Sequence, residues 1–95
     1  MSTSGGTIGG RIRVTLYGRA GCHLCDDMRE VVERVARDVP LVVEAIDVDT
    51  DPALAAAHGA DVPVLFVNGR KAFKYRVDPA ALRARLAREG RRPSE

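Results

Sequence analysis

The segment from Arg11 to Val48 constrains the fold of this chain more than any other. Ile12, Val14 and Leu16 alternate with polar residues, a pattern typical of a strand with one buried face. After a loop that contains glycine, apolar residues recur at the spacing of one helix face; they are Leu24, Met28, Val31, Val32 and Val35. Residues 41–48, rich in Val and Ile, predict a second strand. A strand, a helix of about four turns and another strand form a parallel βαβ unit with a right-handed crossover.

The rest of the chain predicts a hairpin and two more helices within one domain. In chain order, the expected elements are a short helix opened by Asp51-Pro52 and closed by Gly59, a strand over 62–67, an Asn68-Gly69 turn, an edge strand over 70–75, and a helix over 80–88 opened by Asp78-Pro79. The predicted order is β-α-β-α-β-β-α. Residues 1–10 are mostly Gly, Ser and Thr and predict a disordered tail. We therefore expect a domain over 11–89 and a second tail over 90–95.

The net charge of +2 is too small to indicate binding to nucleic acid or to a membrane surface. No apolar run approaches the roughly 18 residues of a membrane span, and residues 1–10 lack the apolar stretch of a secretory signal. We therefore expect a cytoplasmic protein, and a monomer. Because cytoplasmic thiols are kept reduced, a close pair of cysteines there indicates catalysis or metal binding rather than a structural disulfide.

Cys22 and Cys25 form such a pair, at the start of the first predicted helix. The free N–H groups of a helix start favour an anion, and the pKa of such cysteines can fall to about 3.5–7. We predict that Cys22, at the exposed end, is the nucleophile, and that Cys25, toward the buried face, is the resolving thiol. We expect no metal, because a zinc site needs about four ligands and the chain offers no second cysteine pair. The alternative is two ordinary half-buried cysteines.

Three segments together resemble the glutaredoxin branch of the thioredoxin superfamily: Leu16–Cys25, Asp61-Val62-Pro63 and Phe66–Gly69. The resemblance covers about residues 11–88, and Cys22-His23-Leu24-Cys25 is similar to a small CHLC-type glutaredoxin-like group. It implies an α/β thioredoxin-like fold with a four-stranded mixed sheet in the order 2-1-3-4, flanked by helices. It also implies a cis Val62-Pro63 peptide bond beside the cysteines. The backbone of Val62 would pair with the substrate as an added strand does.

The resemblance also suggests further residues of a substrate site. Arg19 stands where glutaredoxins place a lysine near the thiolate and the glutathione carboxylate. His23 lies between the cysteines and either influences Cys22 or is a solvated residue of the first helical turn. Tyr17 ends the first strand and either borders the substrate groove or packs against a neighbour. Residues 73–78 contain no glycine where glutaredoxins carry a paired-glycine motif, and we expect Tyr75 and Arg76 to fill or reshape the groove there.

These observations predict a thiol–disulfide oxidoreductase that acts through a Cys22–Cys25 dithiol. Its substrate would be a disulfide-containing protein or a glutathione mixed disulfide, with a reductase or glutathione as the electron donor. No cofactor is expected to be bound, although glutathione is a candidate reductant. The alternative function is a non-enzymatic thioredoxin-like module that binds an iron–sulfur cluster or a protein partner.

Overall fold

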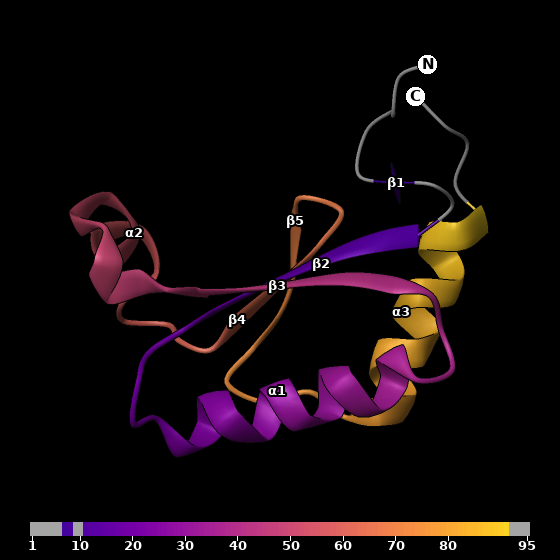
Figure 1. Cartoon of the computed structure of the whole chain (residues 1–95), viewed down its shortest axis with the longest axis horizontal. Helices are drawn as coiled ribbons and strands as arrows, with labels where there is room; N and C mark the ends of the chain where they lie inside the picture. Colours follow the sequence, from indigo (N-terminus) through magenta and orange to yellow (C-terminus); the bar gives the residue numbers. More distant parts are fainter. Residues whose placement is uncertain (1–6, 9–10, 92–95) are drawn as a thin grey trace.

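A computed structural model describes residues 7–8 and 11–91 of the chain. Its elements, in chain order, are β1 (Thr7–Ile8), β2 (Arg11–Gly18), α1 (His23–Ala36), β3 (Leu41–Asp47), the 3₁₀ helix η1 (Val48–Thr50), α2 (Pro52–His58), β4 (Val64–Val67), β5 (Arg70–Lys74) and α3 (Pro79–Arg91). In Figure 1, α1 and α3 lie on one side of the sheet, and α2 lies beyond the end of β3. The order of the predicted elements is thus confirmed, with β1 and η1 added.

The four main strands lie side by side in the order β3-β2-β4-β5. Strand β2 pairs in parallel with β3 and antiparallel with β4, which pairs antiparallel with β5. This is the mixed sheet in the order 2-1-3-4 that the resemblance implied. A parallel neighbour needs a long crossover, which α1 supplies between β2 and β3.

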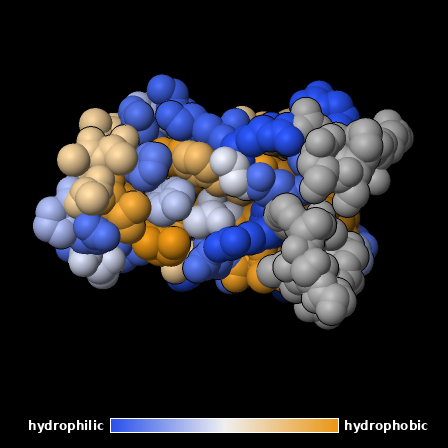
Figure 2. Space-filling view, turned by 90° about the horizontal axis from the view of Figure 1, so that it is seen from above, coloured by the Kyte–Doolittle hydropathy of each residue, from blue (hydrophilic) through white to orange (hydrophobic). Residues whose placement is uncertain are grey.

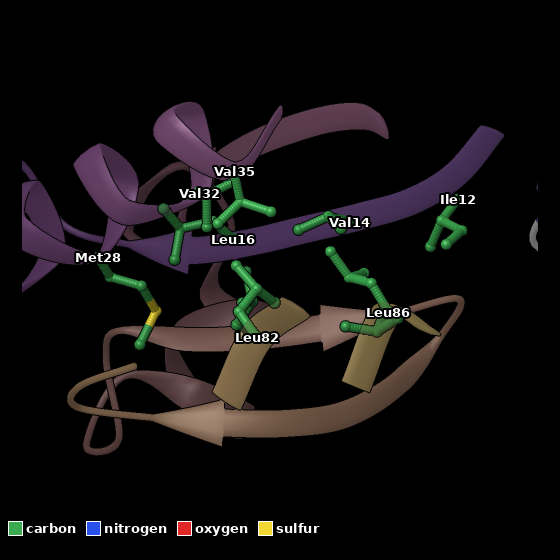
Figure 3. Packing of buried hydrophobic residues seen from close by; sticks show 10 residues of the cluster. Ile12, Val14, Leu16, Met28, Val32, Val35, Leu82 and Leu86 are labelled. Carbon is green, nitrogen blue, oxygen red and sulfur yellow. The ribbon is translucent and has the colours of Figure 1, made fainter. Parts of the chain in front are cut away.

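The hydrophobic core lies between the sheet and the two helices α1 and α3. Val14 and Leu16 of β2 face Met28 and Val32 of α1, while Leu82 of α3 fills the space beside them (Figure 3). Each of these side chains is at most 4% exposed. Burying an aliphatic side chain of this size stabilises a fold by about 1.5–3 kcal/mol, so these contacts fix α1, and the cysteines at its start, against the sheet.

Local turn and cap chemistry agrees with the sequence prediction. An Asp51 Oδ1 atom accepts a hydrogen bond from the Ala53 N–H at 2.8 Å, which caps α2. Asn68 and Gly69 have φ values of 50° and 83°, so the hairpin between β4 and β5 uses the positive-φ turn that this dipeptide favours.

The boundaries differ from the prediction at both ends of the domain. Thr7 and Ile8, which the sequence placed in a disordered tail, pair as β1 with the start of β2, where β4 does not reach. The last helix continues past the expected end at Gly90 to Arg91. Its final turns are held by Glu89, which accepts hydrogen bonds from Arg85 at 3.3 Å and from Asn68 at 3.1 Å. The remaining residues of both predicted tails lie outside the described residues.

The two faces of the sheet are covered unequally. Opposite α1 and α3, the short helix α2 covers only the end of the sheet where Tyr17 lies, through ring contacts of His58. Figure 2 views this face from above and shows hydrophilic and hydrophobic residues side by side. Within residues 7–8 and 11–91, no helix has the length and apolar character needed to cross a membrane.

Candidate redox site

Cys22 lies where β2 has ended and α1 is about to begin. It is the N-cap residue of α1, with φ −96° and ψ 117°, and its side chain is half-buried. Its Sγ accepts a hydrogen bond from the backbone N–H of Cys25 at 3.2 Å. Gly21, directly before it, has φ +77° and allows the loop to turn into the helix. The first turn of α1 therefore directs an N–H group at the Cys22 sulfur.

Cys25 is buried one turn further into the helix. Its side chain is 6% exposed and packs against Gly18, where an added Cβ would lie 3.3 Å from the Cys25 Sγ. Burial and, second to it, the hydrogen bond with Cys22 raise the pKa of the Cys25 thiol to about 11, against the opposing effect of a hydrogen bond with the Arg19 backbone. The two thiols thus differ as predicted in exposure: Cys22 is accessible, and Cys25 is protected and protonated.

Pro63 lies across the sheet from the cysteine loop. The register pairs Tyr17 with Val64, which places Gly18 opposite Pro63. The Val62-Pro63 peptide bond is cis, as the resemblance implied. Within the described part of the chain, the backbone N–H and C=O of Val62 form no hydrogen bond with other backbone groups. Among the described residues, the main-chain groups of Val62, next to Pro63, are therefore unpaired.

The Arg19 side chain is paired with a carboxylate of the chain itself. Its Nε and Nη2 atoms donate to the two carboxylate oxygens of Asp49 at 2.9 and 3.2 Å, and its Nη1 donates to the Gly59 carbonyl at 3.3 Å. The guanidinium holds the pKa of the Asp49 carboxyl below its usual range. Arg19 thus ties the cysteine loop to η1 and to the end of α2, and its charge is already paired.

Gly59 permits this contact through its lack of a side chain. Its φ of −56° is one that any residue adopts, so it does not end α2 through a left-handed conformation. An added Cβ would instead lie 2.5 Å from the Ala55 carbonyl oxygen and 3.2 Å from Arg19 Nη2.

Tyr17 packs rather than lining the cysteine loop. Its ring stacks on His58, with centroids 4.6 Å apart, and meets the edge of Phe66 at 5.4 Å. His58 was not predicted to contact Tyr17, although His58 is the last residue of α2 and Tyr17 is the last but one of β2. The buried Nδ1 of His58 has no hydrogen-bond partner within the described residues. His23 is exposed at the first position of α1.

A cavity of about 230 Å³ opens beside Cys25, on the side of β3. Arg19, Asp26, Arg29 and Asp47 line it together with Cys25. Cys25 therefore borders a hollow lined by charged residues, whereas Cys22 does not line this hollow. Among residues 7–8 and 11–91, no three His, Cys, Asp or Glu side chains form a group that could hold a metal ion.

Tyr75 follows β5 in a conformation that glycine usually adopts. Its φ is +70°, and its N–H donates to the Pro63 carbonyl at 2.8 Å. Its hydroxyl donates to Asp61 Oδ1 at 3.3 Å, and the Lys74 ammonium lies 5.3 Å from its ring centroid. Tyr75 is therefore hydrogen-bonded to Asp61 and Pro63, the residues on either side of Val62. The sequence predicted a change of the groove at Tyr75 but not these contacts.

Comparison with known proteins agrees with this architecture. Residues 13–87 match the model of the Glutaredoxin-like domain family (DUF836). An uncharacterized protein of Mycobacterium tuberculosis is 34% identical over 83 residues, which cover 82% of this chain and 86% of that protein.

Solved structures show the same fold. A structural-genomics target protein from X. campestris is 38% identical, covers 79% of this chain and 96% of its own, and superimposes with a TM-score of 0.67. A mutant thioredoxin from Halobacterium salinarum is 26% identical, with coverage of 86% and 77% and a TM-score of 0.67. The sheet order, the cysteine pair and the family match lead to one conclusion: this chain belongs to the glutaredoxin-like domain family (DUF836) of thioredoxin-fold proteins.

Proposed function

We propose that the protein is a thiol–disulfide oxidoreductase with Cys22 as the nucleophile and Cys25 as the resolving thiol. The observation that carries this proposal is the difference in burial and hydrogen bonding between the two cysteines. The accessible Cys22 Sγ accepts an N–H hydrogen bond at the helix start, and Cys25 is buried one turn away. The thiolate is the reactive form of cysteine, and an N–H donor stabilises the thiolate more than the thiol.

The reaction follows from this contrast. The Cys22 thiolate attacks one sulfur of a substrate disulfide, and the S–S bond of the substrate breaks as a mixed disulfide forms. The departing substrate thiolate takes a proton from water. Cys25 then loses its proton to water, attacks Cys22 Sγ and releases the second substrate thiol. In sum, two electrons pass from the dithiol to the substrate, and Cys22 and Cys25 end as a disulfide. Both cysteines give up their protons to water, and both substrate sulfurs, which leave as thiolates, take up protons from water.

The main-chain groups of Val62, which are unpaired among the described residues, support the proposal that the substrate binds next to them. An extended segment on either side of the substrate cysteine can pair with the Val62 N–H and C=O, the mode of recognition in which a strand is added to a sheet. The cycle needs no bound cofactor, only a thiol donor that reduces the Cys22–Cys25 disulfide. Such a cycle suits the reducing cytoplasm, where donors of this kind are maintained.

A turnover assay tests this function. The purified protein is supplied with a disulfide-linked model peptide and, in parallel, with glutathione plus its reductase or with thioredoxin plus thioredoxin reductase. We expect reduction with at least one donor and its loss in Cys22→Ser, while Glu44→Gln, which breaks an exposed ion pair with Arg13, keeps wild-type activity. Activity that survives in Cys22→Ser, or the visible absorbance of an iron–sulfur cluster in an inactive protein, would contradict the proposal.

A further inference from the structure

We infer that the thiol partner of this site is an extended polypeptide rather than a small thiol that carries carboxylates, such as glutathione. The inference rests on the proposed oxidoreductase function and names its partner class. Four features support it: the pairing of Arg19, the capping of α3, the carboxylate of Asp61, and the open backbone of Val62. The first three weaken or oppose the attraction of these groups for the carboxylates of a small anionic thiol, and the fourth suits a polypeptide.

The guanidinium of Arg19, in the loop that precedes Cys22, is already engaged. Arg19 meets both carboxylate oxygens of Asp49 and also donates to the Gly59 carbonyl. A guanidinium binds a carboxylate best through two parallel hydrogen bonds, and this pair has that geometry. A carboxylate on an incoming thiol would have to displace Asp49, so Arg19 contributes little attraction for it.

The N-terminus of α3, which follows Tyr75 in the chain, is already capped and is not available to an anion of the partner. Helix α3 begins at Pro79, and its free N–H groups are the kind that attract an anion. The Asp78 carboxylate accepts from the Ala80 and Ala81 N–H groups at 3.0 and 3.2 Å. The chain therefore supplies its own anion at this helix start.

Asp61 adds a negative charge directly beside Val62. Its carboxylate accepts the Tyr75 hydroxyl at 3.3 Å and has the Lys74 ammonium at 4.0 Å, a distance at the limit of an ion pair. Tyr75 is held at φ +70° in making this contact, a conformation that costs a residue with a side chain about 1–2 kcal/mol. The fixed carboxylate disfavours a partner that itself carries carboxylates near its cysteine.

An extended polypeptide does not depend on such charges. Its main chain continues on both sides of the cysteine, so it can pair with the open N–H and C=O of Val62 without a terminal carboxylate nearby. Tyr75, a residue that is 41% exposed, offers an aromatic surface beside that path. Aromatic side chains of this kind supply contact area at low conformational entropy.

The test compares two thiols on the oxidised wild-type protein. Second-order rate constants for reduction of the Cys22–Cys25 disulfide are measured with glutathione and with an uncharged nine-residue peptide that has blocked ends and one central cysteine. Rates are corrected for the pKa of each thiol. We expect the peptide to react at least about tenfold faster, the worth of one hydrogen bond to a charged group. Equal rates, or a faster reaction with glutathione, would overturn the inference. A protein that reacts with neither thiol would remove the proposed function itself.

A double variant tests whether the contacts of Arg19 and Tyr75 cause the preference for the peptide. Asp49→Asn weakens the hold on Arg19, and Tyr75→Gly removes the contact with Asp61 at a φ that glycine adopts freely. Together they should lower the ratio of peptide rate to glutathione rate by about tenfold. The matched control Glu44→Gln, on an exposed pair with Arg13, should leave the ratio within about twofold. An unchanged ratio in the folded double variant would show that these contacts do not select the partner.

Discussion

The protection of Cys25 can be measured by alkylation. Burial and the hydrogen bond with Cys22 raise the pKa of the Cys25 thiol to about 11 from an ordinary value of 9.0. At pH 8 the thiolate fraction is then about 100 times smaller than in an unperturbed cysteine, because each pKa unit is a factor of about ten. A more basic thiolate is intrinsically more nucleophilic, by about eightfold over two units, so titration alone slows Cys25 by about tenfold.

Burial of the sulfur adds to this effect, because Cys25 is only 6% exposed. We therefore expect iodoacetamide to modify Cys25 at least about tenfold more slowly in the folded protein than in denaturant at the same pH. The assay uses fully reduced wild-type protein and tryptic digestion. The fragment between Arg19 and Arg29 carries both cysteines, and tandem mass spectrometry then assigns each modified sulfur.

The dependence on pH gives a second readout. The Cys25 rate should continue to rise to about pH 11, whereas an unperturbed thiol levels off near pH 9. Since the folded pKa lies above the unfolded one, the neutral thiol stabilises the fold fully below about pH 9, and this stability is lost as the pH rises through about 11. A plateau near pH 9, or equal rates in the folded and unfolded protein, would refute the assignment of Cys25 as the protected thiol.

Three further predictions concern stability. Leu82→Ala, at a fully buried core position, should lower the free energy of unfolding by about 2–5 kcal/mol in a urea titration, while Val43→Ala, 40% exposed, should change it by less than about 0.5 kcal/mol; equal effects would contradict the described core. Gly59→Ala should lower the melting temperature because the new Cβ would meet the Ala55 carbonyl oxygen at 2.5 Å, and a rise would show that this contact is absent. Gly21→Ala meets no atom within 4 Å but is held at φ +77°, so a loss of about 1–2 kcal/mol is expected from backbone strain alone.

Local sequence rules predicted most of the fold. The alternation of Val14 and Leu16 with polar residues identified β2, and the cap and turn residues Asp51, Asn68 and Gly69 fixed where neighbouring elements begin and turn. These signals act over a few residues, so they are readable without tertiary structure. The addition of β1 was missed because Thr7 and Ile8 pair only through an edge of β2 that β4 leaves open.

The candidate site was predicted in part. The cysteine pair lies at the start of α1, and the Val62-Pro63 bond is cis, as the motif and the resemblance implied, while the roles of these residues stay predictions. The partner of Arg19 was not predicted, because Asp49 lies in η1, just after β3 and thirty residues away in sequence. The sequence did hold a signal for this contact. Arg19 and Asp49 each follow one of two predicted parallel strands, whose carboxyl ends lie at the same edge of the sheet. The conformation of Tyr75 had no such signal, since its φ depends on tertiary contacts with Pro63 and Asp61.

Trapping the mixed disulfide tests the division of roles between the two cysteines most directly. With Cys25→Ser, the intermediate between Cys22 and a disulfide-linked peptide cannot be resolved, so it should accumulate in stoichiometric amount on non-reducing mass spectrometry. Cys22→Ser, which retains only the buried thiol, should form the adduct at least about tenfold more slowly at pH 8. A stable adduct on Cys25 that forms as fast as the one on Cys22 would contradict the account.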